Sequence, residues 1–236
     1  MIDSPEEVPL RGGRVTAGVS RVGETVRRPS KLSSPFVRAL LVELEQSGFD
    51  AAPRHLGKDD HGREIFSFQA GDVPRELDSD ISDEALAAAA RLIRRYHDAT
   101  ESIALAGDAE VVCHNDLSPC NCVFRDGLPV GLIDFDNAAP GSRLEDLGYA
   151  LFLWLNLGTD GAPLEEQARR IDLFCRAYGL SADEAVVEAI VDAVTLNVQR
   201  LHHERRRDDV EWWQAQLDWL LERRDALTRL LGQRGT

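Results

Sequence analysis

The hydrophobic pattern of this chain changes near residue 80, and this change limits the folds available to it. Before that point, valines interleaved with polar residues and glycines predict strands within 8–28 and a hairpin of 54–57 with 64–68. One helix, over about 34–48, lies between them. After residue 80, apolar residues recur mainly at helical spacing. The order predicts an α+β fold of two lobes, a small antiparallel sheet with one helix and then a larger, mainly helical part.

The connection between the two lobes is predicted at 71–80, which contains Pro74 and four acidic residues, with the hinge at about 68–74. This divides the chain into an N-terminal lobe, 1–70, and a C-terminal lobe, 71–236. Helices of the second lobe are expected at about 82–100, 144–156, 163–178, 182–206 and 209–231. Short apolar runs predict buried strands at 111–113, 122–124 and 129–133.

The formal net charge of −14 comes entirely from the C-terminal part. Residues 1–70 contain ten Lys/Arg and ten Asp/Glu, whereas residues 71–236 contain 17 and 31. Such an acidic field disfavours nucleic acid and membrane partners and favours a cationic small molecule. The alternative is that acidic helices only keep the protein soluble. Because neither a membrane span nor a signal peptide is apparent, a cytoplasmic protein is expected.

Three of the four cysteines lie close together in the sequence. Cys113, Cys120 and Cys122 surround His114, and thiolate and imidazole groups are zinc ligands. Their spacing matches no common zinc pattern. Reduced thiols that pack as small apolar side chains are therefore the preferred interpretation.

Polar residues suited to phosphate chemistry gather in the middle of the chain. His114-x-Asp116 is followed by Asn121, and Asp134 begins an Asp-Phe-Asp sequence thirteen residues later. An Asp-Gly turn between two short apolar runs predicts a hairpin that brings Asn121 and Asp134 side by side. These two residues offer the hard oxygen ligands that Mg²⁺ prefers. Asp116 could orient an acceptor hydroxyl and accept its proton.

This region resembles the aminoglycoside phosphotransferase and choline kinase-like family of the protein-kinase-like superfamily. The family favours H-x-D-x-x-x-x-N and I-D-F/W-D/E-x-A, which are found here as His114–Asn121 and Ile133–Ala138. The likeness covers about 1–150 well and 151–236 weakly. It implies a bilobal protein-kinase-like fold that uses Mg²⁺ and ATP, with GTP as an alternative, to phosphorylate a hydroxyl of a small molecule, as antibiotic-resistance kinases do.

The resemblance also implies roles for individual residues. Asp116 would be the catalytic base, and Asn121 and Asp134 would hold Mg²⁺. His114 would brace the catalytic loop, and Asp146 would hydrogen-bond this loop from the next helix.

The N-terminal lobe departs from the protein-kinase pattern. Gly12 and Gly13 belong to a glycine-rich stretch that could lay backbone N–H groups over the triphosphate. Arg27 best matches the position of the usual lysine, with Arg28 on the opposite side of the strand, and arginine can bind phosphate bidentately. No partner glutamate is obvious on the following helix. The residues expected at the adenine are Phe68 and Ala70.

The acceptor is expected in the acidic helical lobe. Its candidate carboxylates are Asp136 and Glu204, and aromatic residues that could stack on it are Trp154, Trp212 and Trp213. Three functions remain open, namely phosphotransfer to an aminoglycoside-like molecule, a kinase for a metabolic alcohol such as choline, homoserine or a sugar, and a nucleotide-binding pseudokinase. The replaced lysine favours the pseudokinase, whereas the complete Asp116, Asn121 and Asp134 set argues against it.

Overall fold

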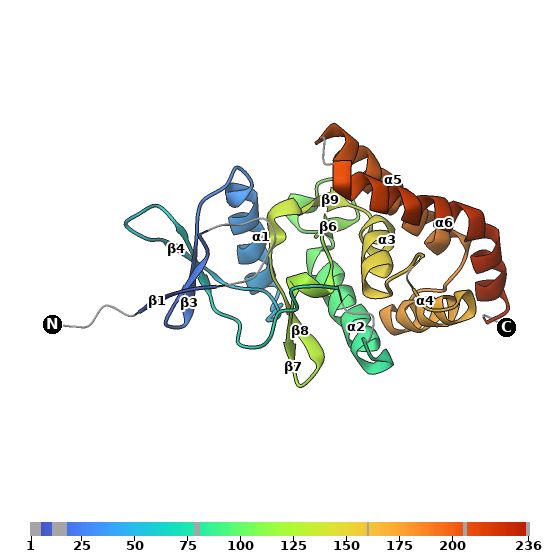
Figure 1. The fold of residues 1–236 in the computed structure, drawn as a ribbon. Coiled ribbons are helices and arrows are strands. Elements are labelled where there is room, and N and C mark those ends of the chain that lie inside the picture. Colours follow the sequence, from blue (N-terminus) through green and yellow to red (C-terminus); the bar gives the residue numbers. More distant parts are fainter. Residues whose placement is uncertain (1–5, 11–17, 78–80, 160, 205–206, 235–236) are drawn as a thin grey trace.

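The computed structural model describes residues 6–10, 18–77, 81–159, 161–204 and 207–234. Figure 1 shows a strand-rich part with one helix beside a larger part built mainly of helices. The predicted α+β architecture is confirmed.

Five short antiparallel strands form the sheet of the N-terminal part, in the order β1-β2-β3-β5-β4. Their bounds are Glu7–Pro9 (β1), Ser20–Val22 (β2), Thr25–Arg28 (β3), His55–Lys58 (β4) and Glu64–Ser67 (β5). The predicted hairpin of 54–57 with 64–68 is present as β4 and β5, and the strands predicted within 8–28 include a second hairpin, β2 with β3. The pairing of β3 with β5 then joins the two hairpins into one sheet.

Helix α1 (Ser34–Gln46) lies between this sheet and the helical part (Figure 1). It has a proline in its first turn, where no intrahelical hydrogen bond is lost. Its buried apolar residues recur at the i, i+3, i+4, i+7 spacing of one helix face, and these are Val37, Leu40, Leu41 and Leu44.

The segment that follows β5 is hydrogen-bonded to the helical part. Asp72 and Phe124 exchange two backbone hydrogen bonds, of 2.9 and 2.7 Å. Gly71 has a φ of +145°, and a Cβ atom there would lie 2.4 Å from the carbonyl oxygen of Phe124. Only glycine allows so close an approach in this conformation. The connection therefore crosses over strand β7 (Cys122–Arg125) at a defined place.

The C-terminal part consists of helices around two short strand pairs, β6–β9 and β7–β8. Its helices are α2 (Asp83–Thr100), α3 (Arg143–Trp154), α4 (Leu164–Tyr178), α5 (Glu184–His203) and α6 (Arg207–Gly232). Its other strands are β6 (Val111–Cys113), β8 (Leu128–Leu132) and β9 (Ala139–Gly141). The predicted helices agree with these bounds to within about three residues. Strand β9 was not predicted, because proline and glycine disfavour a strand.

Helix α3 packs closely on α5. A Cβ atom on Gly148 of α3 would lie 2.2 Å from the carbonyl oxygen of Ala189 of α5, so the glycine permits this contact. A capping box of Ser142 and Glu145 determines where α3 begins.

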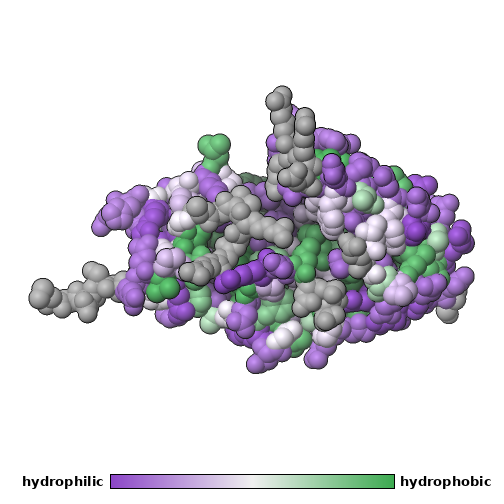
Figure 2. Space-filling view, in the orientation of Figure 1, coloured by the Kyte–Doolittle hydropathy of each residue, from purple (hydrophilic) through white to green (hydrophobic). Residues whose placement is uncertain are grey.

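The surface is largely hydrophilic. Figure 2 shows hydrophilic residues over most of one face, with hydrophobic residues in separate patches. Exposed apolar side chains such as Leu32 and Leu196 lie in different parts of the fold. Within the described residues, no helix is both long enough and apolar enough to cross a membrane.

Candidate active site

The loop after β6 and the segment after β8 meet at His114. The His114 side chain is fully buried, and its Nε2 donates to the carbonyl oxygen of Ile133 at 3.0 Å. Its ring lies 4.7 Å, centroid to centroid, from the ring of Phe135. His114 therefore joins the His-x-Asp segment to the Asp-Phe-Asp segment.

Asp146, in the first turns of α3, holds the backbone of this loop. Its carboxylate is buried and accepts hydrogen bonds from the backbone N–H groups of His114 (2.7 Å) and Asn115 (2.8 Å). It also accepts one from His97 Nε2 (3.0 Å), and His97 Nδ1 lies 2.8 Å from the Tyr178 hydroxyl. Asn115 has a φ of +60°, a conformation that asparagine tolerates better than most residues. These bonds orient the residue that follows, Asp116.

Asn121 is positioned by the loop that precedes it. Its Nδ2 donates to the backbone carbonyl oxygen of Asp116 at 2.9 Å, so its Oδ1 is turned the other way. The carbonyl oxygen of Asn121 accepts from the backbone N–H of Ile133 at 2.9 Å. Strands β7 and β8 pair as predicted, with Cys122 opposite Leu132. Asn121 and Asp134 therefore flank the same end of one hairpin.

Asp134 has a left-handed backbone, with φ +64° and ψ +60°. A non-glycine residue in this region is strained, and such strain gathers at functional sites. The turn at Phe135–Asn137 that follows keeps Phe135 buried while the Asp134 side chain stays one-third exposed. The conformation thus turns the carboxylate out of the core.

The Asp116 carboxyl is more basic than an ordinary aspartate. Burial raises its pKa, and the nearby Asp134 carboxylate raises it further, although His114, Asn121 and Arg200 oppose the shift. A raised pKa makes an aspartate a better proton acceptor. The site thus contains one basic carboxylate beside a pair of oxygen ligands.

Arg28, rather than Arg27, faces these residues. Its Nη1 donates to Asp134 Oδ1 at 3.1 Å, and its Nη2 bonds Asp136. Arg27 lies on the other face of β3, where it donates to Thr25 Oγ1 at 2.6 Å. The prediction that gave this position to Arg27 is therefore corrected.

The sequence contains a feature that could have identified Arg28 as the arginine facing the site. The apolar residue of β3, Val26, packs against the core, and side chains two apart on a strand share one face. Arg28 therefore lies on the same face of β3 as Val26, toward α1 and the helical part, and Arg27 lies on the opposite face.

The contacts of Asp136 also correct a prediction. This residue was expected at the acceptor, but it contacts the N-terminal part, where Lys31 Nζ lies 2.5 Å from its Oδ2 and Ser33 Oγ lies 3.4 Å from its Oδ1. Although burial raises the pKa of Asp136, the bonds from Lys31 and Arg28 hold it below its ordinary value. Asp136 therefore joins the two parts through ion pairs.

The other predicted site residues either have different contacts or lie outside the described part of the chain. The ring of Phe68 is covered by Arg21, whose guanidinium carbon lies 3.7 Å from the ring centroid. The Ala70 carbonyl accepts from Arg125 Nε at 2.9 Å. Glu204 is exposed at the end of α5. Gly12 and Gly13 lie outside the described residues.

Among the described residues, no group of three or more His, Cys, Asp or Glu side chains is placed to hold a metal ion. The cysteines therefore form no metal cluster with those residues. Cys113 and Cys122 are buried, and burial raises the pKa of both thiols. Asn121 with Asp134 is a smaller set, and it fits Mg²⁺ because phosphate oxygens and water complete the coordination of this ion.

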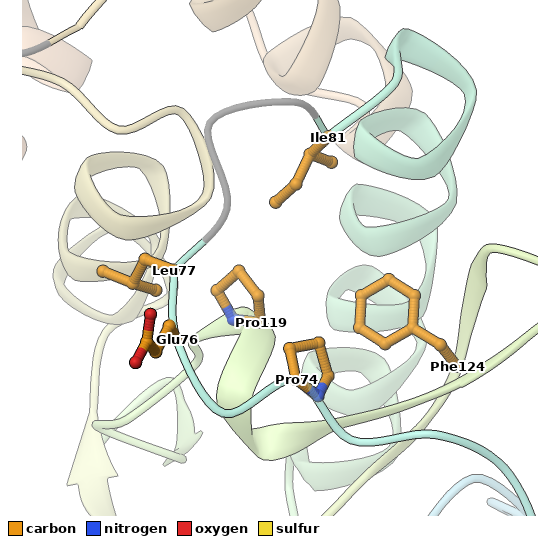
Figure 3. Close-up of a pocket in the computed structure, with 6 residues that line it drawn as sticks. All are labelled: Pro74, Glu76, Leu77, Ile81, Pro119 and Phe124. Carbon is orange, nitrogen blue, oxygen red and sulfur yellow. The ribbon is translucent and has the colours of Figure 1, made fainter.

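A cavity of about 480 Å³ lies between the segment that follows Gly71 and the turn at Pro119–Asn121. The side chains that line it belong to Pro74, Glu76, Leu77, Ile81, Pro119 and Phe124. Figure 3 shows Pro74, Pro119 and Phe124 close together, with the Glu76 carboxylate at the edge. Among the described residues that line it, none is Asp116, Asn121 or Asp134, although Pro119 belongs to the same turn as Asn121.

Comparison with known proteins agrees with this geometry. The model of the phosphotransferase enzyme family matches residues 101–190. The trifolitoxin immunity protein of Rhizobium leguminosarum bv. trifolii is 30% identical over 263 residues, which cover 96% of this chain and 99% of that protein.

Solved structures share the fold at low sequence identity. The gentamicin complex of APH(2'')-IIa is 17% identical with a TM-score of 0.63, over 93% of this chain and 92% of that one. The aminoglycoside phosphotransferase APH(3'')-Id of Streptomyces rimosus, with ADP and streptomycin, is 17% identical with a TM-score of 0.56, over 92% and 93%. The motifs, the fold and the full-length relative agree, and the chain belongs to the phosphotransferase enzyme family.

Proposed function

We propose that this protein transfers the γ-phosphoryl group of ATP to a hydroxyl of a small molecule. The observation that supports this best is the meeting of Asp116, Asn121 and Asp134 at one end of the β7–β8 hairpin. The S. rimosus neighbour is bound to ADP and streptomycin, and the Rhizobium relative is an immunity protein. Protection against an antibiotic or a toxin is therefore the role that we propose.

The proposed chemistry depends mainly on positioning and charge. Asp116 would orient the acceptor hydroxyl and accept its proton, a role that suits its raised pKa. Asn121 and Asp134 would hold Mg²⁺, which neutralises negative charge on the triphosphate when it is bound. Asp146 and His114 would keep the loop in place through the hydrogen bonds described above.

The N-terminal part would supply cations to the phosphates. Arg28 pairs with Asp134 and Asp136, and Lys31 pairs with Asp136, which supports this role for both side chains. With Mg²⁺ on Asp134, the Arg28 guanidinium would be available to phosphate oxygens, which arginine can bind bidentately. Residues 68–74 would form the hinge between the lobes.

The proposal is tested by ADP release from Mg-ATP and Mg-GTP. The acceptor panel should contain aminoglycosides, macrolides, choline, homoserine and sugars, so that antibiotic and metabolic acceptors are compared directly. We expect one class to stimulate ADP release. Nucleotide binding without stimulation by any acceptor, and without slow hydrolysis, would instead indicate a pseudokinase.

Asp134→Ala is expected to abolish the Mg²⁺-dependent part of nucleotide affinity, because Asn121 alone is too weak a ligand. Nucleotide titrations with Mg²⁺ and with a chelator measure this difference. Asp60→Ala, in an exposed turn of the N-terminal part, is the matched control. Unchanged Mg²⁺ dependence in Asp134→Ala would show that the metal is held elsewhere.

Arg28→Gln is expected to raise the KM for ATP by about tenfold or more, because it removes a charge-assisted contact to phosphate. Arg27→Gln makes the same change of charge on the other face of β3 and should leave this KM within about twofold. Steady-state kinetics with varied ATP decide between the two arginines. A larger effect at Arg27 would restore the assignment made from the sequence.

A further inference from the structure

Among the described contacts, neither carboxylate of helix α1 bonds Arg28. Protein kinases orient the phosphate-binding lysine of the third strand with a glutamate on the helix that follows, and this ion pair is needed for activity. The acidic residues of α1 are Glu43 and Glu45, both in its last turn, and Glu45 Oε1 lies 3.7 Å from Arg54 Nε. The Arg28 guanidinium is bonded by carboxylates of the helical part instead.

The carboxylate that remains with Arg28 is that of Asp136. Nη2 of Arg28 bonds Asp136, while Nη1 donates to Asp134 Oδ1 at 3.1 Å. Asp134 and Asp136 stand on either side of the buried Phe135, which anchors the turn that carries both carboxylates. Because Asp134 is assigned to Mg²⁺ in the proposed function, Asp136 is the carboxylate left to orient the guanidinium.

Asp136 also contacts the connection between β3 and α1. Its Oδ2 lies 2.5 Å from Lys31 Nζ, and its Oδ1 lies 3.4 Å from the Ser33 hydroxyl. Ser33 is the N-cap residue of α1, but its side chain makes no cap hydrogen bond to this helix. The first turn of α1 contains no acidic residue, so Asp136 brings a favourable negative charge to this helix end from another part of the fold.

The pair between Arg28 and Asp136 is shielded from solvent. The side chains are 13% and 16% exposed, so salt and water screen their attraction less than that of a surface pair. The guanidinium is planar and has five N–H donors. A bond to Asp136 therefore sets the orientation of the whole group and leaves other donors for phosphate oxygens.

We propose that Asp136 is a positioning residue for phosphate binding, which orients the Arg28 guanidinium from the helical part as the helix glutamate does in protein kinases. Asp136 has this role only if the protein binds nucleotide phosphates, so the proposal rests on the phosphotransferase function. Because the two partners lie in different parts of the fold, Arg28 is oriented only while these parts are in contact. Phosphate binding and the contact between the two parts are thereby coupled.

A double-mutant cycle in nucleotide binding tests this role. The probe is the non-hydrolysable ATP analogue AMP-PNP with Mg²⁺, titrated by calorimetry. Asp136→Asn should bind it about tenfold more weakly than wild type, the size of one charge-assisted hydrogen bond. In the Arg28→Gln background, Asp136→Asn should weaken binding no further, because its effect passes through the guanidinium. Asp136→Glu keeps the charge and should lose less affinity than Asp136→Asn.

Asp59→Asn is the matched control. Asp59 is 15% exposed and lies 3.9 Å from Nε of Arg27, on the other face of β3, so the variant removes an equally buried carboxylate beside the other arginine. Its affinity should stay within about twofold of wild type. Unchanged or tighter binding by Asp136→Asn, or additive losses in the double variant, would overturn the positioning role. No binding of the analogue by wild type would overturn the phosphotransferase function itself, and the role of Asp136 with it.

Discussion

Asp116→Asn is expected to slow phosphoryl transfer by about a hundredfold or more while Mg-ATP still binds. The amide keeps the shape of the side chain but cannot accept the proton of the acceptor hydroxyl. The loop should stay in place, because its hydrogen bonds to Asn121 and Ser118 use the backbone carbonyl of Asp116. Acceptor-dependent ADP release and nucleotide titration measure the two effects.

Asp126→Asn is the matched control, because Asp126 lies in the β7–β8 turn with a φ of +51° that asparagine also adopts. This variant should keep normal turnover. If Asp116→Asn also retained near-normal turnover, the proton would have another acceptor and the assigned role would be wrong.

The stability of the same variant tests the electrostatics of the site. Asp116 has a raised pKa in the folded protein, so its contribution to stability is present below the pKa of the unfolded chain and is lost as the pH rises through the folded pKa. Its charge therefore destabilises the fold at neutral pH. Asp116→Asn should raise the Tm at pH 7 relative to wild type, and this difference should shrink as the pH falls through the folded pKa and be gone below about 4.

Asp146→Ala is expected to reduce the free energy of unfolding by about 3–5 kcal/mol, because it leaves buried donors without an acceptor. The donors are the backbone N–H groups of His114 and Asn115 and Nε2 of His97. Denaturant unfolding measures this loss. Turnover should fall as well, because the backbone that orients Asp116 is no longer held.

Asp98→Ala is the control for Asp146→Ala, because it removes a carboxylate of the same size from the same region. Asp98 is about half exposed and pairs with Arg94 and Arg143 at the surface, so its loss should cost about 1 kcal/mol or less. A similarly small cost for Asp146→Ala would mean that water or a neighbouring group replaces its carboxylate.

Local sequence patterns predicted most of the secondary structure, including the hairpin between Asn121 and Asp134. The Asp126-Gly127 turn and the apolar runs beside it are sufficient for the β7–β8 hairpin, which brings Asn121 next to Asp134. Helices such as α2 follow from their apolar period and from a serine cap at Ser82. These features depend on residues close together in the chain, so composition and spacing determine them.

The direction in which an individual side chain points depends on tertiary packing. Alternation along β3 places Arg27 and Arg28 on opposite faces, but the packing of Val26 decides which face meets the helical part. The partners of Asp136 also depend on tertiary packing, because Lys31 and Arg28 reach it from the N-terminal part of the fold. Spacing within one strand or turn contains no information about the element that will cover it.

The contacts between side chains of different helices are furthest from what the sequence shows. Tyr149 of α3 packs on Trp213 of α6, and His97 meets Asp146 across 49 positions of the chain. Helical periodicity predicts that each helix has a buried face, but not which helix packs against which. The hairpin that brings Asn121 beside Asp134 is therefore determined by local sequence, whereas the buried contacts that hold the neighbouring loop are made only when α2 and α3 pack together.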